Sequence, residues 1–343
     1  MAFYDVVVVG GGLSGCTAAR ILAEKNYKVL IIEQKKHLGG QIYDFKNEVG
    51  ITIHKYGPHI FHTQIEKVWN FVNRFTDFSN FQHRVLSFAE GNFINFPINR
   101  QTLNAVFGTN LTTAEVPNFL ANEVAKAQFN NPPLSFRDKV VSQVGERLYT
   151  LFFEKYTEKQ WNRDCKDLPA FIIKRLPVRF TYDNNYFNDR YQGIPIGGYN
   201  IIIEKMLENC DVELNVDYLK EKEKYDSLAE KVLFTGPIDE YYEYNLGRLE
   251  YRTLRFENET IKDTDNYQGN AVVNYTSHEY KFTRIIEHKH FEFNECKGTV
   301  ITREYPKEWE PGDEAYYPIN DEKNNKLFME YEQVAKKDKK VIF

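Results

Sequence analysis

Hydrophobic residues in the first 33 positions follow a pattern typical of a parallel sheet with a helix packed on it. Residues 4–9 read Tyr-Asp-Val-Val-Val-Val, a β-branched run that predicts a fully buried strand. Residues 16–26 have helical composition, and residues 28–32 form a second apolar run that ends at Glu33. The pattern therefore predicts a strand, a helix and a strand in direct succession.

A glycine-rich turn joins the first strand to the helix. Residues 10–15 read Gly-Gly-Gly-Leu-Ser-Gly and fit G-x-G-x-x-G. Glycine lets the backbone turn tightly and approach a pyrophosphate, whose charge is stabilised by free N–H groups at a helix N-terminus. An acid at the end of the second strand, here Glu33, can accept hydrogen bonds from ribose hydroxyls. Together these features predict a dinucleotide-binding site.

A second glycine pair favours FAD over NAD as the dinucleotide. Residues 33–40 end in Leu-Gly-Gly, which resembles the extended fingerprint of flavoproteins related to glutathione reductase and the amine oxidases. In those proteins the second pair lets the backbone pass close to the cofactor; an ordinary turn is the alternative interpretation. The candidate cofactor-binding residues are Gly10, Gly12, Leu13, Ser14, Gly15, Glu33, Gln34, Gly39, Gly40, His59 and Gly236.

Residues 99–173 are helical in character and predict a separate unit inserted into the dinucleotide-binding frame. Ser135-x-x-Asp138 is typical of a helix N-cap. Phe152 and Tyr156 are four positions apart in a predicted helix, so they share one of its faces. Such an aromatic pair is usually core, and the pattern alone does not assign it to a site.

The remaining segments predict a return to the parallel sheet and a second, antiparallel one. Residues 212–216 and 231–235 are expected to rejoin the parallel sheet, whereas residues 248–303 alternate polar and apolar residues as an antiparallel sheet does. Further strands are predicted at 51–56, 84–99 and 340–343, and further helices at 66–75, 146–156, 200–207 and 327–335.

Composition narrows the class of protein. At 343 residues the chain can form two or three domains, and 42% hydrophobic with 27% charged residues is typical of a soluble globular protein. No segment approaches the roughly 20 apolar residues of a membrane helix, and the N-terminus leaves no room for a signal peptide. The four cysteines are far apart, as expected for free thiols in a reducing cytosol. A net charge of −5 argues against nucleic acid as a partner.

His59 and His62 lie in the loop after the strand predicted at 51–56. Two histidines could begin a metal site, but nothing nearby supplies a third ligand, so we predict no metal. A histidine-bearing loop beside a flavin ring is the better interpretation.

Seven short segments together resemble the UDP-galactopyranose mutase family of flavoenzymes. They follow the family order along nearly the whole chain, which makes the match specific. The segments are 56–63 (YGPHIFHT), 156–161 (YTEKQW), 174–180 (KRLPVRF), 185–187 (NYF), 251–254 (YRTL), 283–289 (TRIIEHK) and 316–318 (YYP).

The resemblance implies an α/β fold in three parts. A Rossmann-like, FAD-binding parallel sheet would be discontinuous in sequence, with an inserted helical domain and an antiparallel β-sheet domain. The implied boundaries are 1–78, 194–242 and 318–343 for the FAD-binding domain, 99–178 for the helical domain, and 79–98, 179–193 and 243–317 for the antiparallel sheet domain.

The resemblance also assigns roles to individual residues. It matches Arg175 and Arg284 to two arginines that face the substrate diphosphate, and His62 to a histidine beside the flavin; these three are the candidate catalytic residues. The candidate substrate-binding residues are Phe152, Tyr156 and Trp161 at the uridine end, Arg175, Tyr186, Arg284 and Tyr317 at the diphosphate, and Asn274 and Glu304 in the active cleft.

The implied reaction is an isomerisation that uses a redox cofactor. In the family, UDP-galactopyranose and UDP-galactofuranose interconvert through a covalent adduct of the sugar with N5 of reduced FAD. The protein holds the diphosphate leaving group and places the sugar against the flavin. The implied substrate is UDP-galactose or UDP-N-acetylgalactosamine, acted on by a cytoplasmic homodimer that serves cell-surface polysaccharide biosynthesis.

Departures from the family pattern leave two alternatives open. Gln41, His83 and Asn162 stand where the family commonly has Asn, Asn and Gly. The family also continues past its final Val-Ile-Phe strand into a turn and helix that contact FAD and diphosphate, so we expect these 343 residues to hold FAD poorly and turn over slowly. The alternatives are a truncated, weakly active or inactive nucleotide-binding relative, and an amine-oxidase-like flavin oxidoreductase.

Overall fold

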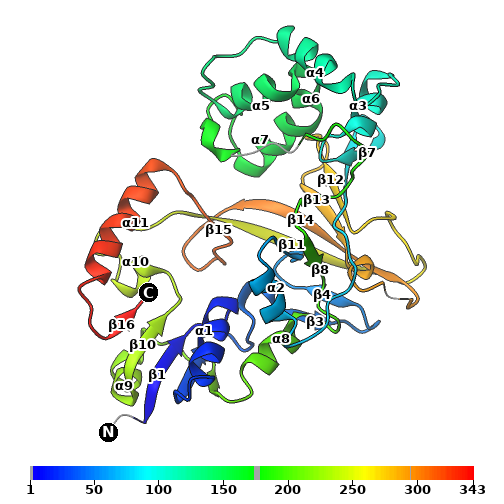
Figure 1. Cartoon of the computed structure of the whole chain (residues 1–343). Helices are drawn as coiled ribbons and strands as arrows, with labels where there is room; N and C mark the ends of the chain where they lie inside the picture. The colour runs from blue at the N-terminus through cyan, green and yellow to red at the C-terminus, as the bar shows by residue number, and fades with distance from the viewer. Residues whose placement is uncertain (1–2, 174–177, 294) are drawn as a thin grey trace.

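The computed structural model describes residues 3–173, 178–293 and 295–343, which form three structural units (Figure 1). A parallel sheet with its helices forms the lower part of the view, a second sheet crosses the middle, and a helical unit lies at the top. The expected α/β fold, with a discontinuous Rossmann-like sheet, an inserted helical unit and a separate sheet, is confirmed.

The parallel sheet has five strands in the order β16-β10-β1-β2-β9. Helices α1 and α8 pack on one face and α9 and α10 on the other, which explains why β2 is buried along its whole length. The elements are β1 (Tyr4–Val9), α1 (Leu13–Ala23), β2 (Val29–Glu33), α8 (Tyr199–Met206), β9 (Asp211–Leu214), α9 (Lys222–Leu228), β10 (Ala229–Phe234), α10 (Ile238–Tyr241) and β16 (Val341–Ile342).

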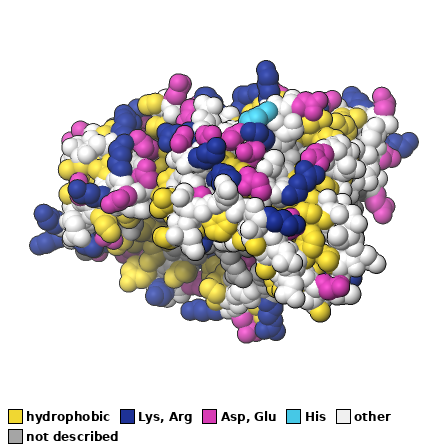
Figure 2. Space-filling view, turned by 90° about the horizontal axis from the view of Figure 1, so that it is seen from above, with side chains coloured by type: hydrophobic (Ala, Val, Ile, Leu, Met, Phe, Trp, Pro, Cys, Tyr) yellow, Lys and Arg dark blue, Asp and Glu magenta, His cyan; other side chains and the backbone are white. Residues whose placement is uncertain are grey.

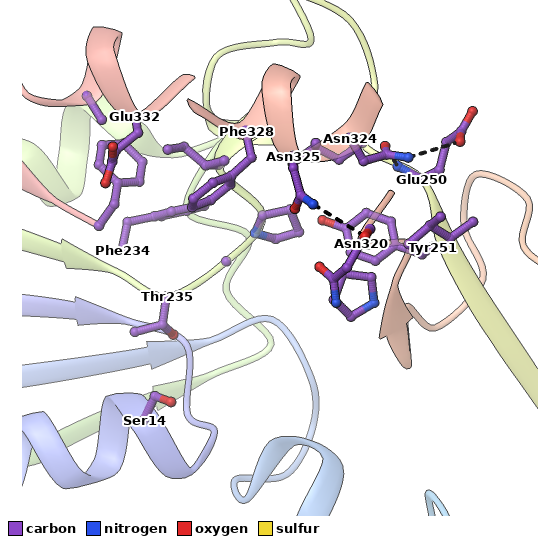
Figure 3. A pocket seen from close by; sticks show the side chains of 18 of the residues that line it. Ser14, Phe234, Thr235, Glu250, Tyr251, Asn320, Asn324, Asn325, Phe328 and Glu332 are labelled. Atoms are coloured by element: carbon purple, nitrogen blue, oxygen red, sulfur yellow. Dashed lines mark hydrogen bonds between the residues drawn. The ribbon is translucent and has the colours of Figure 1, made fainter. Parts of the chain in front are cut away.

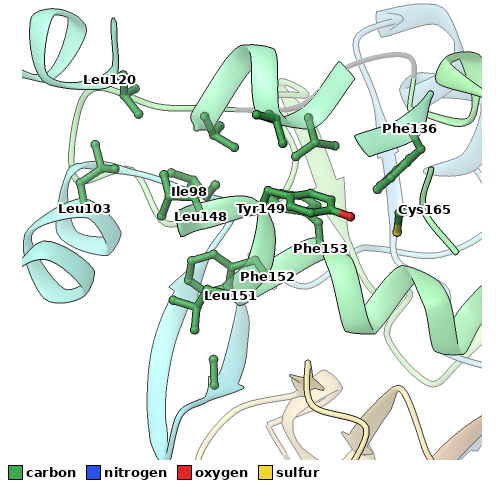
Figure 4. Packing of buried hydrophobic residues seen from close by; sticks show 14 of the residues in the cluster. Ile98, Leu103, Leu120, Phe136, Leu148, Tyr149, Leu151, Phe152, Phe153 and Cys165 are labelled. Atoms are coloured by element: carbon green, nitrogen blue, oxygen red, sulfur yellow. The ribbon is translucent and has the colours of Figure 1, made fainter. Parts of the chain in front are cut away.

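The helical unit has a hydrophobic core of its own, in which Leu103, Leu148 and Tyr149 are almost fully buried (Figure 4). The predicted cap at Ser135 is confirmed, because its hydroxyl accepts a hydrogen bond from the Asp138 N–H at 3.1 Å. The elements are α3 (Arg100–Phe107), α4 (Val116–Ala125), α5 (Phe136–Val144), α6 (Glu146–Tyr149), the π-helix η2 (Thr150–Glu154) and α7 (Lys155–Trp161).

The second sheet has seven strands in the order β15-β11-β14-β13-β12-β6-β7. It is antiparallel except that β12 pairs in parallel with β6, so the purely antiparallel sheet that we predicted is wrong at this point. The whole helical unit lies between these two strands in sequence, and only such a long connection permits parallel pairing. The strands are β6 (Val85–Ala89), β7 (Asn92–Phe96), β11 (Tyr251–Ile261), β12 (Val272–Tyr275), β13 (Arg284–Glu287), β14 (Thr299–Glu308) and β15 (Tyr317–Pro318).

The remaining elements are mostly short, apart from the 14-residue helix α11. They are η1 (Gly40–Ile42), β3 (Asp44–Lys46), β4 (Thr52–His54), β5 (Phe61–Thr63), α2 (Glu66–Val72), η3 (Ala170–Ile172), β8 (Tyr191–Gly193), η4 (His288–Phe291) and α11 (Glu322–Ala335). Basic and acidic side chains are interspersed over the face shown in Figure 2. Within the described ranges, no helix is both long and apolar enough to cross a membrane.

Candidate functional site

The glycine turn brings two backbone segments into direct contact at the carboxyl end of β1. Gly12 forms an isolated bridge with Gly39, and the Gly39 N–H donates to the Gly11 carbonyl at 2.7 Å. A Cβ on Gly40 would lie only 2.9 Å from the Gly12 Cα. The second glycine pair is therefore required for this close approach.

Gly15 and Gly12 of the turn differ in the atoms that an added side chain would contact. A Cβ on Gly15 would lie 2.0 Å from the Gly10 carbonyl oxygen, so this glycine is required for packing α1 against β1. A Cβ on Gly12 would meet only the Gly40 Cα, at an ordinary 3.9 Å. Gly12 borders a cavity, so the lack of a side chain there leaves room for a ligand rather than for neighbouring protein.

The carboxylate of Glu33 is fixed at the wall of this cavity, which measures about 270 Å³. Its Oε2 accepts from the Gly11 N–H at 2.7 Å, and its Oε1 accepts from the Lys35 N–H at 2.8 Å. A carboxylate held in this way can also accept hydrogen bonds from ribose hydroxyls. The predicted residues Gly10, Gly12, Glu33, Gln34, Gly40 and Gly236 border the cavity, which fits the nucleotide end of a dinucleotide.

A larger cavity of about 980 Å³ adjoins the first at Thr235 and Gly236, which border both (Figure 3). Ser14, in the first turn of α1, lies at its edge, and Phe328 of α11 gives it an apolar wall. Both cavities open at the carboxyl ends of parallel strands, where α/β sheets bind their ligands. Leu13 is partly exposed at the start of α1.

A third cavity, of about 340 Å³, lies between the helical unit and the mixed sheet. Its walls combine aromatic rings with the polar side chains of Ser87, Thr157, Gln160 and Asn274, which suits a flat heterocycle with hydrogen-bonding edges such as a nucleobase. It is bordered by the predicted substrate residues Phe152, Tyr156, Trp161, Tyr186 and Asn274, together with Ser87, Phe96, Phe136, Phe153, Thr157, Gln160, Ile172 and Ile173.

The helix that borders this cavity is not regular. We predicted one continuous helix over 146–156, whereas the structure has a short α6, the π-helix η2 and then α7. Phe152 and Phe153 lie in η2, and Tyr156 begins the part of α7 that borders the same cavity. Single π-turns inside α-helices are frequent at functional sites because they change which side chains face a ligand.

Four polar residues form a row across the mixed sheet. Ser87 on β6 is paired with Asn274 on β12, and Asn274 is paired with Arg284 on β13. Arg284 is paired in turn with Glu304 on β14. Directly paired residues project from the same face of a sheet. The row therefore leads from the aromatic cavity to the guanidinium of Arg284.

Arg284 is the cation at the centre of the cleft. Its Nε donates to Glu304 Oε2 at 2.8 Å, and both residues border a small cavity with Gln41, His59 and Tyr317. Burial disfavours the charge of Arg284, but the Glu304 carboxylate reverses this effect and raises the pKa of Arg284 above its ordinary value. Arg284 therefore stays charged and faces a space that an anionic group could enter.

Two tyrosines lie near this guanidinium. Burial raises the pKa of Tyr156 and of Tyr317, although the positive charge of Arg284 opposes the increase in both. Both hydroxyls therefore stay protonated at neutral pH. A protonated hydroxyl beside an arginine is a second hydrogen-bond donor for a bound anion.

The predicted catalytic residue His62 lies away from these cavities. The ring of His62 stacks on Phe187 at 3.6 Å, and its Nδ1 lies 2.5 Å from Asp189 Oδ2 on a partly exposed surface. His62 borders none of the cavities above. Arg175 lies outside the described residues, so its role stays a prediction.

Sequence reasoning missed several residues at the aromatic cavity. Gln160 is four positions after Tyr156, so helical spacing could have indicated it. Arg252 donates to the Gln160 carbonyl, and its guanidinium lies 5.1 Å from the ring centre of Trp161. Ser87 carried no signal, because only the pairing of β6 with β12 brings it to Asn274.

Comparisons with known proteins agree with this geometry. The family model described as UDP-galactopyranose mutase matches residues 151–343, and that of an NAD(P)-binding Rossmann-like domain matches residues 8–75. A solved structure of reduced UDP-galactopyranose mutase aligns with a TM-score of 0.67 at 16% identity, over 92% of this chain and 82% of that one. At that identity the structural match supports the fold alone.

Two curated relatives extend over almost the whole chain. The dTDP-fucopyranose mutase of Escherichia coli is 40% identical over 345 residues, covering 98% of this chain and 91% of that protein. A probable UDP-galactopyranose mutase of Klebsiella pneumoniae is 39% identical over 344 residues, covering 99% of this chain and 88% of that protein. The dinucleotide turn, the row of polar residues through Arg284 and these matches lead to one assignment: the chain belongs to the UDP-galactopyranose mutase family of flavin-dependent isomerases.

Proposed function

We propose that this protein interconverts the pyranose and furanose rings of a nucleoside diphosphate sugar, with reduced FAD as its cofactor. The observation that carries the proposal is the row from Asn274 to Glu304, which places a charged Arg284 beside an aromatic cavity. A nucleotide sugar offers matching chemistry, since it has a flat base, two phosphates and a sugar in that order. An amine substrate would need neither the arginine nor a base-sized aromatic cavity.

FAD would be held by the glycine turn and the carboxylate of Glu33. Gly12 leaves the backbone open to a pyrophosphate, and the N-terminus of α1 would stabilise its charge. Reduced flavin supplies a nucleophilic nitrogen that can form a covalent bond to the anomeric carbon. We extend the same role in cofactor binding to Leu13, Ser14, Gly15, Gln34, Gly39, Gly40, His59 and Gly236.

The protein's own residues would bind and orient the nucleotide. The base would stack on the aromatic rings at Phe152, Tyr156 and Trp161, where each stacked base gains about 1–3 kcal/mol. Arg284 would hold the diphosphate, and a charge-assisted hydrogen bond of this kind contributes roughly 1.5–3 kcal/mol. Because Glu304 already fixes Arg284, little reorganisation is needed as the leaving group gains charge. Tyr186, Asn274 and Tyr317 would supply further contacts.

Two nucleotide sugars, which differ in their nucleoside and in their sugar, are the candidate substrates. The relatives point to UDP-galactopyranose and to dTDP-fucopyranose, which differ at C5 of the base, at C2′ of the nucleoside ribose and at C6 of the transferred sugar. Our initial expectation of UDP-galactose or UDP-N-acetylgalactosamine therefore widens to include dTDP-fucopyranose. The division into three domains, the homodimer, the cytoplasmic location and the role in cell-surface polysaccharide biosynthesis stay predictions.

A direct assay tests the proposal. Flavin released by denaturation should have the mass of FAD, and the reduced protein should convert one of these nucleotide pyranoses to its furanose while the oxidised protein does not. Recovery of NAD in place of flavin would contradict the cofactor. Oxygen consumption with an amine and no mutase activity would favour the oxidoreductase alternative. Nucleotide binding without turnover would favour an inactive relative.

A further inference from the structure

Lys159, on the helix α7 that borders the aromatic cavity, inserts its ammonium group among three backbone carbonyls. Its Nζ donates to the carbonyl oxygens of Tyr275 at 2.7 Å, Phe282 at 2.9 Å and Tyr280 at 3.0 Å. An ammonium has three protons, so these contacts use its full donor capacity. Burial lowers the pKa of Lys159 to about 8, which leaves the group mainly protonated at neutral pH.

The carbonyls of Tyr280 and Phe282 belong to the connection between β12 and β13, and that of Tyr275 belongs to the last residue of β12. Asn274 directly precedes this connection, and Arg284 follows Phe282 by two residues. Lys159 itself lies on α7 between Tyr156 and Trp161, which border the aromatic cavity. Lys159 thus ties the helix of the aromatic cavity to the connection between the two site strands of the sheet, and the exposed contact of Glu158 with His278 at 3.0 Å joins the same two segments.

We propose that Lys159 is a positioning residue that sets the spacing between the base subsite and the diphosphate arginine. This inference rests on the proposed nucleotide-sugar function. The base would be held by the helical unit and the diphosphate by β13 of the mixed sheet. Strands β6 and β7, at one edge of the sheet, pack on the helical core, whereas Val273 and Ile285 of β12 and β13 belong to a different cluster. A ligand that touches both gains its full binding energy only when the two units are held at a fixed separation.

The chain provides a matched control in Lys289. Its Nζ also donates to three carbonyl oxygens, those of Asp265 at 3.0 Å, Gly298 at 3.0 Å and Cys296. These carbonyls belong to two loops, on either side of β12 and β13 in sequence, that contribute no residue to the candidate site. Lys289→Met therefore removes an equivalent set of hydrogen bonds without touching the connection between Asn274 and Arg284.

The test compares ligands that span both units with ligands that reach only one. The flavin-loaded wild type, Lys159→Met and Lys289→Met are titrated with UDP and dTDP, and with uridine and thymidine as probes of the base subsite alone. In Lys159→Met we expect the Kd of the diphosphate to rise about tenfold and that of the nucleoside to change less than about twofold. KM for the nucleotide sugar should rise more than kcat falls, and flavin content should be unchanged. Lys289→Met should leave all four Kd values within about twofold of wild type, whatever its effect on Tm.

Several outcomes would overturn the inference. Equal losses for diphosphate and nucleoside in Lys159→Met would mean that the substitution merely disturbs α7. An unchanged diphosphate Kd would mean that the contacts do not set the spacing. A wild type that binds neither class of ligand would overturn the proposed function itself, and this inference with it.

Discussion

Arg284 and Glu304 stand directly opposite each other on β13 and β14, with Arg284 Nε 2.8 Å from Glu304 Oε2. The pair uses only Nε of the guanidinium, and the terminal nitrogens face Tyr317 and the small cavity that both residues border. A cation fixed in this way can receive a diphosphate without first becoming ordered.

Arg284→Ala should reduce kcat/KM by roughly tenfold to a few hundredfold, since one charge-assisted contact contributes about 1.5–3 kcal/mol. Steady-state kinetics with reduced flavin measures the effect. Arg303→Ala is the matched control, because Arg303 precedes Glu304 on the same strand, points to the opposite face and pairs with Glu259 at 2.7 Å. Equal losses in both variants, or none in Arg284→Ala, would remove Arg284 from the site.

Gly12→Val should abolish flavin binding while the protein still folds. A side chain at Gly12 has room against the protein but would occupy the space of the cofactor's pyrophosphate. Flavin absorbance per protein and circular dichroism of the purified variant separate the two effects. Gly15→Ala should instead disturb folding, because its Cβ would clash with the Gly10 carbonyl oxygen. Full flavin occupancy in Gly12→Val would contradict this reading of the turn.

Tyr156→Ala should weaken nucleoside diphosphate binding by about 1–3 kcal/mol, the value of one base stacked on an aromatic ring. Tyr156→Phe keeps the ring and removes only the hydroxyl, so it should lose clearly less affinity than Tyr156→Ala in calorimetric titrations with UDP or dTDP. If both variants lose the same affinity, the hydroxyl rather than the ring is the important group, and the aromatic cavity does not stack a base.

Acid should destabilise the protein through its buried histidines. Burial lowers the pKa of His288 to about 3, where its Nε2 lies 2.7 Å from the Thr302 hydroxyl. The folded state therefore binds fewer protons than the unfolded state between about pH 6.5 and 3, and stability is lost as the pH falls through that range. Between pH 7.5 and 5.5 one such histidine should lower the free energy of unfolding by about 1.4 kcal/mol.

Urea unfolding at these two pH values checks the sign. His288→Gln can keep a hydrogen bond to Thr302 without titrating. The free energy of unfolding of this variant should therefore change less between pH 7.5 and 5.5 than that of the wild type, by about the same 1.4 kcal/mol. Stability that rises toward pH 5.5, or an unchanged difference in the variant, would contradict the assignment. The pKa of His54 is also lowered well below its usual value by burial, so part of the acid sensitivity should remain.

Local sequence determined the dinucleotide-binding start of the fold. The strand, the glycine turn, α1 and Glu33 lie within 33 residues, and each is specified by neighbouring positions through β-branched composition, backbone freedom at glycine and helical composition. The separate helical unit could be predicted for the same reason, since helical contacts are three or four residues apart. The family resemblance then supplied the roles of Tyr156, Asn274 and Arg284, which no local pattern carried.

Tertiary structure alone decided how those residues meet. Ser87 and Asn274 are 187 positions apart and become neighbours only because β6 and β12 pair in parallel. The π-helix at Thr150–Glu154 and the carbonyl cage around Lys159 depend on packing between the helical unit and the mixed sheet. Strand pairing and backbone hydrogen bonds use groups that every residue possesses, so side-chain patterns do not specify which distant segments will be joined.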